Sequence, residues 1–276
     1  MKTLYLDCNM GAAGDMLSAA LLELLPPEER PGFIDELNAL GIPGVEFTAQ
    51  PSVKCGITGT HMEVSVNGHT EGEEHHHEHK HEHHEHEHHG HEHHEREHHH
   101  EHGHSHHHSG MHDIEHIVSG HLNIPEKVKS DILAVYNLIA QAESHAHGVP
   151  VTEIHFHEVG TMDAVADVAA VCLLMDRLSP EQVIVSPVHV GSGQVRCAHG
   201  ILPVPAPATA HILTGVPIFG GKIKGELCTP TGAALLRHFA TKFGDMPIMT
   251  LLQVGYGMGS KDFEAANCVR AMLGEA

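Results

Sequence analysis

The feature that most constrains this chain is a run of histidine and glutamate from His75 to His108, which carries most of its 34 histidines. A repetitive polar run offers no apolar face from which to build a core, so we expect it to be disordered. It therefore divides the 276 residues into an N-terminal segment at 1–70, an insert at 71–111 and a larger domain at 112–276. Neutral imidazole is the commonest metal ligand of proteins, so we expect the insert to bind a divalent metal.

The donors of the insert do not select a single metal, because imidazole and carboxylate suit nickel, zinc, copper and cobalt alike. Two alternatives compete with a metal store. One is an engineered tag, which an internal run rich in glutamate does not resemble, and the other is a solvated linker with no function. Imidazoles charge below about pH 6.5, so metal binding should weaken as the pH falls. The candidate ligands at the two ends of the run are His75, His76, His77, His106, His107 and His108.

The chain is strongly acidic, with a formal net charge of −21, of which residues 71–108 carry −9 and the remainder −12. Because no basic stripe or aromatic platform offsets this charge, we expect no nucleic-acid partner. The N-terminus has no apolar signal core, and the most apolar segment, 164–175, is short and contains Asp167, so we expect no membrane partner. Six cysteines without a C-x-x-C pair fit reduced thiols, and the expected location is cytoplasmic.

Short apolar runs alternate with helical periodicity, which predicts an α/β fold, with α+β as the alternative. The N-terminal segment is expected to form a small α/β layer, with strands near 3–6, 45–53 and 59–66 and helices near 16–24 and 28–40. The larger domain is expected to contain a helix from Pro125 to about 148, a buried helix at 162–178 and a strand at 182–190 interrupted by Pro187. A proline-stiffened loop at 199–209 is expected to lead into a helix through Leu213. A further helix capped by Thr229 should follow, and then strands at 247–255 and 267–273 joined through 255–259.

The strongest constellation outside the insert is the sequence HFHE at 155–158. In extended backbone His155 and His157 point the same way, so the two imidazoles can share one metal. Glu158 adds a third metal ligand or a base, and Asp163 adds a carboxylate four residues before Asp167 on the following helix. We therefore expect His155, His157 and Glu158 to bind metal, and Glu158 and Asp163 to be catalytic. The alternative is that the histidines only cap the buried helix or hydrogen-bond to backbone.

Two loop-to-helix junctions are candidate ligand sites, because free N–H groups at the start of a helix bind anions. They are the glycine turn DCNMGAAGD after the first strand and the TPTG sequence of GELCTPTG. A plain capping role is the alternative for both. Cys8 and Cys228 are possible soft ligands, although buried inert cysteine is commoner. The expected cofactor-binding residues are Asp7, Gly11, Gly14, Asp15, His199, Thr229 and Thr231.

Three absent motifs exclude familiar enzyme classes. The sequence has no G-x-x-x-x-G-K-[ST], so it is not a nucleotide-hydrolysing nickel chaperone. It also lacks H-E-x-x-H and G-x-S-x-G, which excludes zincins and hydrolases with a nucleophile elbow.

Five motifs carry a family resemblance, in order along nearly the whole ordered chain: DCNMGAAGDM, EIHFHEVGTMDAVAD, HGILPVPAPAT, GELCTPTGAALL and GYGMGSKDF. The chain resembles the nickel-insertion proteins of lactate racemase maturation, the LarC family, whose members commonly carry a His-rich insert at this place. The resemblance implies a nickel chelatase, or cyclometallase, of the lyase class. Such an enzyme inserts Ni2+ into pyridinium-3,5-bisthiocarboxylic acid mononucleotide to complete the nickel-pincer cofactor.

The resemblance also implies cofactors and partners. It implies CTP with Mn2+ or Mg2+, other cofactor-maturation proteins, and a C-terminal family module that longer members carry and that is associated with CTP binding. Because this chain stops at Ala276, we expect complete CTP-dependent activity to need that module. Formation of a nickel–carbon bond requires loss of a ring proton, and Glu158, Asp163 or a paired histidine is the expected base.

Two other functions stay open at this point. A non-catalytic nickel buffer, storage or delivery protein would use the insert alone. A metal-dependent phosphohydrolase would use Asp7, Asp15 and the histidines. A homo-oligomer is also compatible with the sequence.

Overall fold

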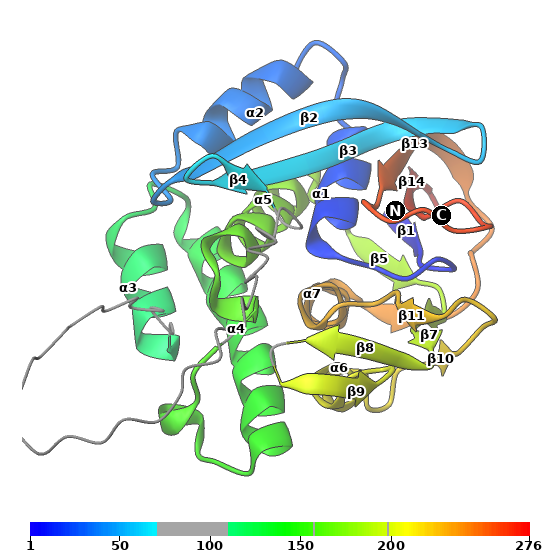
Figure 1. Cartoon of the computed structure of the whole chain (residues 1–276). Helices are drawn as coiled ribbons and strands as arrows, with labels where there is room; N and C mark the ends of the chain where they lie inside the picture. The colour runs from blue at the N-terminus through cyan, green and yellow to red at the C-terminus, as the bar shows by residue number, and fades with distance from the viewer. Residues whose placement is uncertain (71–109, 157, 198) are drawn as a thin grey trace, which may run out of the picture.

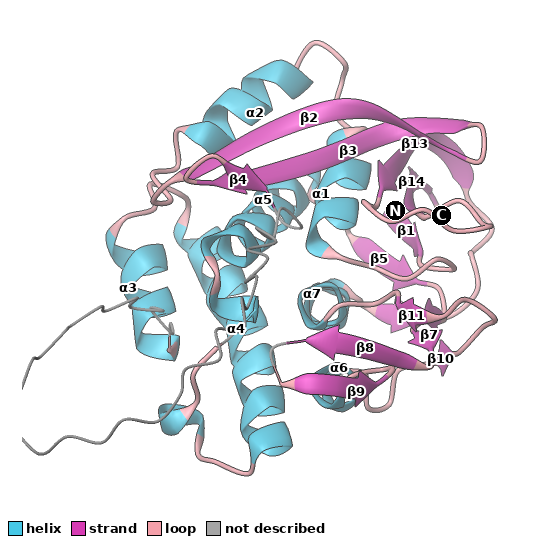
Figure 2. Ribbon diagram, viewed as in Figure 1, coloured by secondary structure: helices cyan, strands magenta, loops and turns pink. Residues whose placement is uncertain are grey.

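The computed structural model describes residues 1–70, 110–156, 158–197 and 199–276 (Figure 1). The insert, and with it the disorder expected there, lies outside the described residues, as do His157, Ala198 and the side chain of Glu158. The predicted α/β fold is confirmed, because helices alternate with strands along the chain and pack beside one mixed sheet (Figure 2). None of the helices in the described part combines the length and apolarity needed to cross a bilayer.

The main sheet joins strands from both sides of the insert. Its strand β1 (Lys2–Asp7) lies between β5 (Gln182–Val185), to which it is parallel, and β14 (Cys268–Glu275), to which it is antiparallel. The N-terminal segment therefore supplies part of the main sheet and does not form a layer of its own. In the described residues the sheet has eight strands, completed by β12 (Lys242–Phe243) beyond β5 and by β13 (Thr250–Met258), β3 (Ile57–Val66), β2 (Val45–Lys54) and β4 (His69–Thr70) beyond β14.

The two faces of the sheet are covered differently. Alternate residues of its central strands, such as Leu4 and Leu6, belong to the large core shared with the helices. The residues between them, Tyr5, Ile184 and Met272, form a smaller buried cluster on the other face. The side of the sheet that faces the helices is therefore the side on which a buried site can form.

The expected helices are present. Helix α5 (Met162–Leu178) has the predicted bounds and is buried along most of its length, as its nearly all-apolar sequence indicates. Thr229 caps α7 (Pro230–Phe239), where its Oγ1 accepts a hydrogen bond from Gly232 N at 3.1 Å. Pro125 precedes the first residue of α4 (Glu126–His147), so it is the N-cap and not the first helical residue. The remaining predicted helices are α1 (Gly14–Leu22), α2 (Arg30–Asn38) and α6 (Pro207–Ile212), and short 3-10 turns lie at Val151–Glu153 and Glu158–Gly160.

Helix α3 (Met111–Gly120) was not predicted. Its apolar residues Ile114 and Val118 stand four apart and are buried, and the helix packs on α4. The helix is rich in histidine and acidic residues, like the insert before it. Its two apolar residues are therefore hard to distinguish from the insert in the sequence. The insert assigned to 71–111 therefore ends just before this helix.

The chain also changes sheets where a single strand and a loop were expected. After β5 it passes Pro187, which cannot donate to a ladder, and enters β6 (Val188–His189), which pairs with β10 (Ile218–Phe219) in a second small sheet. The expected loop at 199–209 is partly a hairpin of β8 (Gln194–Cys197) and β9 (Gly200–Pro203). A further short pair joins β7 (Gly191–Ser192) to β11 (Gly225–Glu226).

The glycines of GYGMG have a packing role. Gly255 and Gly257 were expected in the link between the last two strands but lie inside β13. A Cβ added to Gly257 would lie 1.8 Å from Met16 O, and one added to Gly255 would lie 2.0 Å from Ala20 O. Glycine at these positions lets α1 pack directly on β13.

Candidate functional site

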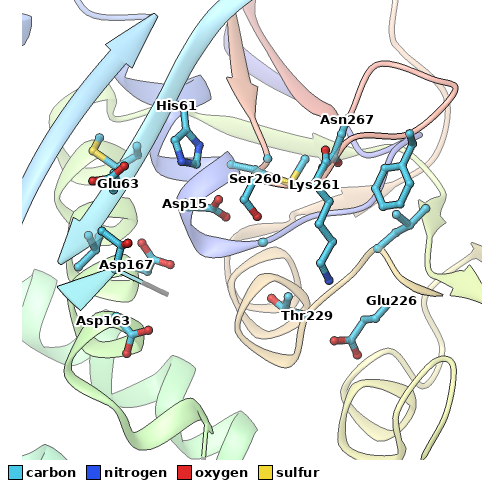
Figure 3. A pocket seen from close by; sticks show the side chains of 18 residues that line it. Asp15, His61, Glu63, Asp163, Asp167, Glu226, Thr229, Ser260, Lys261 and Asn267 are labelled. Atoms are coloured by element: carbon cyan, nitrogen blue, oxygen red, sulfur yellow. The ribbon is translucent and has the colours of Figure 1, made fainter. Parts of the chain in front are cut away.

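A cavity of about 350 Å³ opens where α1, α5, α7, β3 and the loop between β13 and β14 meet (Figure 3). Most of its charged lining residues are acids. The lining consists of Ala13, Asp15, Met16, His61, Met62, Glu63, Val64, Thr70, Asp163, Asp167, Glu226, Leu227, Thr229, Gly259, Ser260, Lys261, Phe263 and Asn267.

Three helices begin at this cavity. Asp15 is the second residue of α1, Asp163 is the second residue of α5, and Thr229 is the cap of α7. The amino ends of helices carry partial positive charge and unpaired N–H groups, which stabilise carboxylates placed in the first turn. The fold therefore collects short polar side chains from distant parts of the sequence at one point.

Backbone contacts hold two of these helix starts side by side. Ala12 N donates to Leu227 O at 3.0 Å, and Thr229 N donates to Ala12 O at 3.0 Å, which pairs the loop before α1 with the loop before α7. Gly11 has a φ of +89°, and a Cβ there would lie 1.9 Å from Leu227 O. Gly11, predicted to bind a cofactor, is thus needed for this close approach.

Gly14 has a comparable role against α5. A Cβ at this position would lie 2.6 Å from both Cβ and Oδ2 of Asp167. The absence of a side chain allows the first turn of α1 to rest against the Asp167 side chain, which fixes Asp167 beside Asp15. Gly14, also predicted to bind a cofactor, therefore positions two carboxylates of the cavity.

Asp15 is electrostatically perturbed. Burial raises the pKa of its carboxyl group, and this effect exceeds the opposing effects of the Met16 N–H, His61 and Lys261. Burial disfavours the charged form, so the carboxylate has a greater affinity for a proton than an exposed aspartate. A carboxyl group of this kind is suited to accept a proton inside a cavity.

His61 offers one ring nitrogen to the cavity. Its Nδ1 lies 2.8 Å from Met258 O. A carbonyl oxygen only accepts hydrogen bonds, so Nδ1 carries a hydrogen. In the neutral ring this contact selects the tautomer whose Nε2 keeps the lone pair that binds a metal.

Four further carboxylates line the same cavity. Asp163 and Asp167 stand four residues apart on α5, Glu63 comes from β3, and Glu226 comes from β11. With Asp15 they make five acids, against Lys261 as the one Lys or Arg among the described lining residues. Imidazole and carboxylate oxygen are donors for nickel and for harder divalent ions, so the cavity has the composition of a cation site.

Several of the expected site residues lie elsewhere. Asp7 is 6% exposed and forms an ion pair with Arg270 of β14, with Arg270 Nε at 3.0 Å, so it ties two strands of the sheet together. His155 is exposed while its neighbours Ile154 and Phe156 are buried, and it does not line the cavity. The expected partner His157, the side chain of Glu158 and the six histidines of the insert lie outside the described residues. The shared metal of His155 and His157 therefore stays a prediction.

His199 lines a second cavity, of about 330 Å³, together with His147. The two imidazole centroids are 4.7 Å apart, and His147 Nε2 lies 3.3 Å from Glu143 Oε2. Glu226 lines both cavities, so the two are neighbours. Thr231 lies in the first turn of α7, is 8% exposed, and belongs to neither lining.

The two cysteines near the glycine turn, Cys8 and Cys228, are fully buried. Burial raises the pKa of the thiol of Cys8 and of Cys228, so both are protonated at neutral pH. In the described residues no group of three or more His, Cys, Asp and Glu side chains is arranged to hold a metal ion.

Part of the cavity was missed from sequence. His61 and Glu63 stand on the same face of the strand predicted at 59–66, which was the available signal for them. Lys261 lies in the GYGMGSKDF motif, and Glu226 lies just before the helix of GELCTPTG. Nothing in the linear sequence indicates that these residues face Asp15 and Asp163 across one cavity.

The fold and the cavity define an α/β protein with an acidic cavity, in a chain that also carries a His-rich insert. Residues 4–276 match the model of the family described as nickel insertion protein, and the chain belongs to this family. No solved structure matches the chain.

Several curated relatives share one name. The chain is 40% identical over its whole length to the pyridinium-3,5-bisthiocarboxylic acid mononucleotide nickel insertion protein of Clostridium kluyveri, and covers 62% of that protein. It is 41% identical to the protein of the same name from Clostridium acetobutylicum and covers 64% of it. The protein of that name from Desulfitobacterium hafniense strain DCB-2 is 37% identical, and 59% of it is covered. The chain thus spans about three-fifths of the length of these relatives.

Proposed function

We propose that this chain inserts nickel into pyridinium-3,5-bisthiocarboxylic acid mononucleotide, the substrate in the names of its relatives. The observation that carries the proposal is the cavity in which five carboxylates and His61 surround a space of about 350 Å³. A space of this size accommodates part or all of a small nucleotide. The reaction brings together a metal dication, two thiocarboxylate sulfurs and a ring carbon.

The donors of the cavity suit a metal that must be given away. Imidazole and carboxylate bind nickel less firmly than a closed set of thiolates, so transfer from His61 and the aspartates to two sulfurs and a carbon runs downhill. Nickel is a substrate in this scheme and leaves with the product. The donors proposed to hold nickel before transfer are His61, Asp163 and Asp167, which line the cavity without being preassembled as a three-ligand group in the described structure.

A base in the same cavity completes the chemistry. Formation of the nickel–carbon bond releases the proton of that ring carbon, which a carboxylate or imidazole must accept. Asp163, an expected base from sequence, lines the cavity. Asp15 lines it too, and burial raises the pKa of its carboxyl group, which favours uptake of a proton. We assign proton removal to Asp15, with Asp163 and the expected Glu158 as the alternatives.

The insert is proposed to supply nickel to this cavity. Thr70 lines the cavity and is followed at once in the sequence by the insert. A metal-binding run attached at the cavity raises the local nickel concentration without being required for the chemistry. The rival function, a nickel buffer or storage protein, would make the insert the whole function.

The further requirements of the reaction follow the family resemblance. We propose CTP with Mn2+ or Mg2+ as cofactors, a cytoplasmic location, other cofactor-maturation proteins as partners, and lyase-class chelatase chemistry. The carboxylate oxygens of Glu63 and Asp167 fit Mn2+ or Mg2+, which prefer oxygen ligands and would neutralise charge on CTP phosphates. Full activity is proposed to need the module that accounts for the remaining length of the relatives.

The test is direct. The protein is mixed with the bisthiocarboxylated mononucleotide, Ni2+, Mn2+ and CTP, with and without the remaining portion of the Clostridium kluyveri relative, and the nickelated product is sought by mass spectrometry. Product supports the enzyme. If the protein binds nickel but neither mixture forms product at any nickel concentration, the result supports the function of a nickel buffer or storage protein.

A further inference from the structure

The charges of the cavity are unevenly divided between its two ends. Figure 3 shows Glu63, Asp163 and Asp167 together on one side, and Lys261 on the other side, where its ammonium group is directed toward Thr229 and where Glu226 also lies. Among the described lining residues Lys261 is the one Lys or Arg. A phosphate group is therefore favoured beside Lys261, whereas the acidic end repels any anion, a thiocarboxylate included, unless a dication offsets the charge of the three carboxylates.

The backbone that carries Lys261 is fixed. Asn267, 5% exposed, donates from Nδ2 to Lys261 O at 2.9 Å, and its own carbonyl accepts from Gly259 N at 3.0 Å. Lys54 Nζ contacts Asp262 Oδ1 at 2.6 Å. These contacts close the loop at 259–267 at its base, so the lysine side chain starts from a defined point at the edge of the cavity.

The nearby start of α7 does not provide the positive charge by itself. Pro230 has no N–H group. Gly232 N donates to Thr229 Oγ1 at 3.1 Å and Ala233 N donates to Thr229 O at 2.9 Å. The start of α7 leaves at most the N–H of Thr231 and the hydroxyl hydrogen of Thr229 for an anion, so the full positive charge at this end of the cavity comes from Lys261.

We infer that Lys261 binds the phosphate monoester of the substrate and thereby sets its orientation in the cavity. The inference rests on the proposed function for the identity of the substrate. With the phosphate at Lys261 and Thr229, the pyridinium ring extends toward His61 and the aspartates of α5. Its two sulfur substituents and the carbon between them then lie at the acidic end, where the metal and the base are placed. Lys261 is a binding residue that takes no part in the proton transfer.

The test compares two ligands that differ only in the phosphate. Pyridinium-3-carboxylic acid mononucleotide and its riboside are titrated calorimetrically, without metal, against the wild type, Lys261→Met, Lys261→Gln and Lys261→Arg. A charge-assisted hydrogen bond contributes about 10- to 100-fold in affinity. We expect the wild type to prefer the mononucleotide by a factor of this order, Lys261→Met and Lys261→Gln to lose the preference, and Lys261→Arg to keep most of it. Lys222→Met, an exposed lysine outside the cavity lining, is the matched control and should leave the preference unchanged.

The outcomes separate this inference from the proposed function. Equal preference in the wild type and in the folded Lys261→Met and Lys261→Gln variants overturns the assignment, and so does a wild type that does not distinguish the two ligands. A phosphate preference that depends on Lys261, in a protein that forms no nickelated product, supports the subsite while the proposed function fails. Product formation that is insensitive to replacement of Lys261 supports the proposed function and overturns the assignment of Lys261.

Discussion

Replacement of Gly14 by alanine tests how the cavity is built. The added Cβ would lie 2.6 Å from both Cβ and Oδ2 of Asp167, whereas carbon atoms in contact are normally about 3.5–4.0 Å apart. The two helices must therefore separate by about 1 Å, because Asp167 Cβ is attached directly to the backbone of α5 and cannot rotate away. The displacement falls on Asp15 and Asp167, the carboxylates that flank the contact.

The size of the effect follows from this distance. Overpacking of a close contact costs about 1–3 kcal/mol in the free energy of unfolding. A misplacement of about 1 Å in a catalytic site lowers the rate by roughly 100-fold. Gly32 of α2 is the matched control, because an alanine Cβ there meets nothing within 4 Å. Gly32→Ala should stabilise the protein by about 0.5–1 kcal/mol through helix propensity alone.

Urea denaturation followed by circular dichroism measures both free energies of unfolding, and product formation measures the rate. We expect the two alanine variants to change stability in opposite directions and only Gly14→Ala to slow nickel insertion. If Gly14→Ala is as stable as the wild type and forms product at the same rate, the close approach of α1 and α5 does not position the site.

Three other changes test separate parts of the account. Thr229→Ala removes the cap of α7 and should lower the free energy of unfolding by about 1 kcal/mol in urea denaturation, with Thr229→Ser nearly unchanged. Asp15→Asn should raise the free energy of unfolding at neutral pH. Burial raises the pKa of Asp15 in the folded protein, so wild-type stability falls as the pH rises from the unfolded-state pKa through the folded-state pKa. Unfolding measured across pH should show that the stability difference between the variant and the wild type shrinks in acid, and a constant difference would contradict this reasoning. Deletion of residues 75–108 should abolish most nickel binding in equilibrium dialysis yet leave insertion intact at excess nickel, and complete loss of insertion would favour the buffer function.

Local sequence rules predicted most helices and strands. The apolar run at 162–178, the Thr229-Pro230 cap and the alternation at 59–66 each determine an element through contacts within a few residues. The sheet order could not be predicted in this way, because β1 pairs with β14 from the far end of the chain. Nor could α3, whose short apolar pattern lies in a sequence with the composition of the insert.

The same limit applies to the site. Asp15, Asp163 and Thr229 were identified individually, since each marks the start of a helix. Their convergence depends on the pairing of Ala12 with Cys228 and on the close approach of Gly14 to Asp167. Asp7 follows the rule that ligands bind at the carboxyl ends of strands, yet Arg270, 263 residues away, already occupies its carboxylate. Gly255 and Gly257 look like a turn, and only the packing of α1 on β13 explains them.

The central claim is that nickel is inserted in the cavity that Asp15 and Asp163 line. The most direct measurement is the yield of nickelated mononucleotide, by mass spectrometry, from wild type and from a protein carrying both Asp15→Asn and Asp163→Asn, each with the remaining portion of the Clostridium kluyveri relative, CTP, Mn2+ and saturating Ni2+. We predict product from the wild type and none from the double variant, whose insert still binds nickel. Equal yields from the two proteins would contradict the claim.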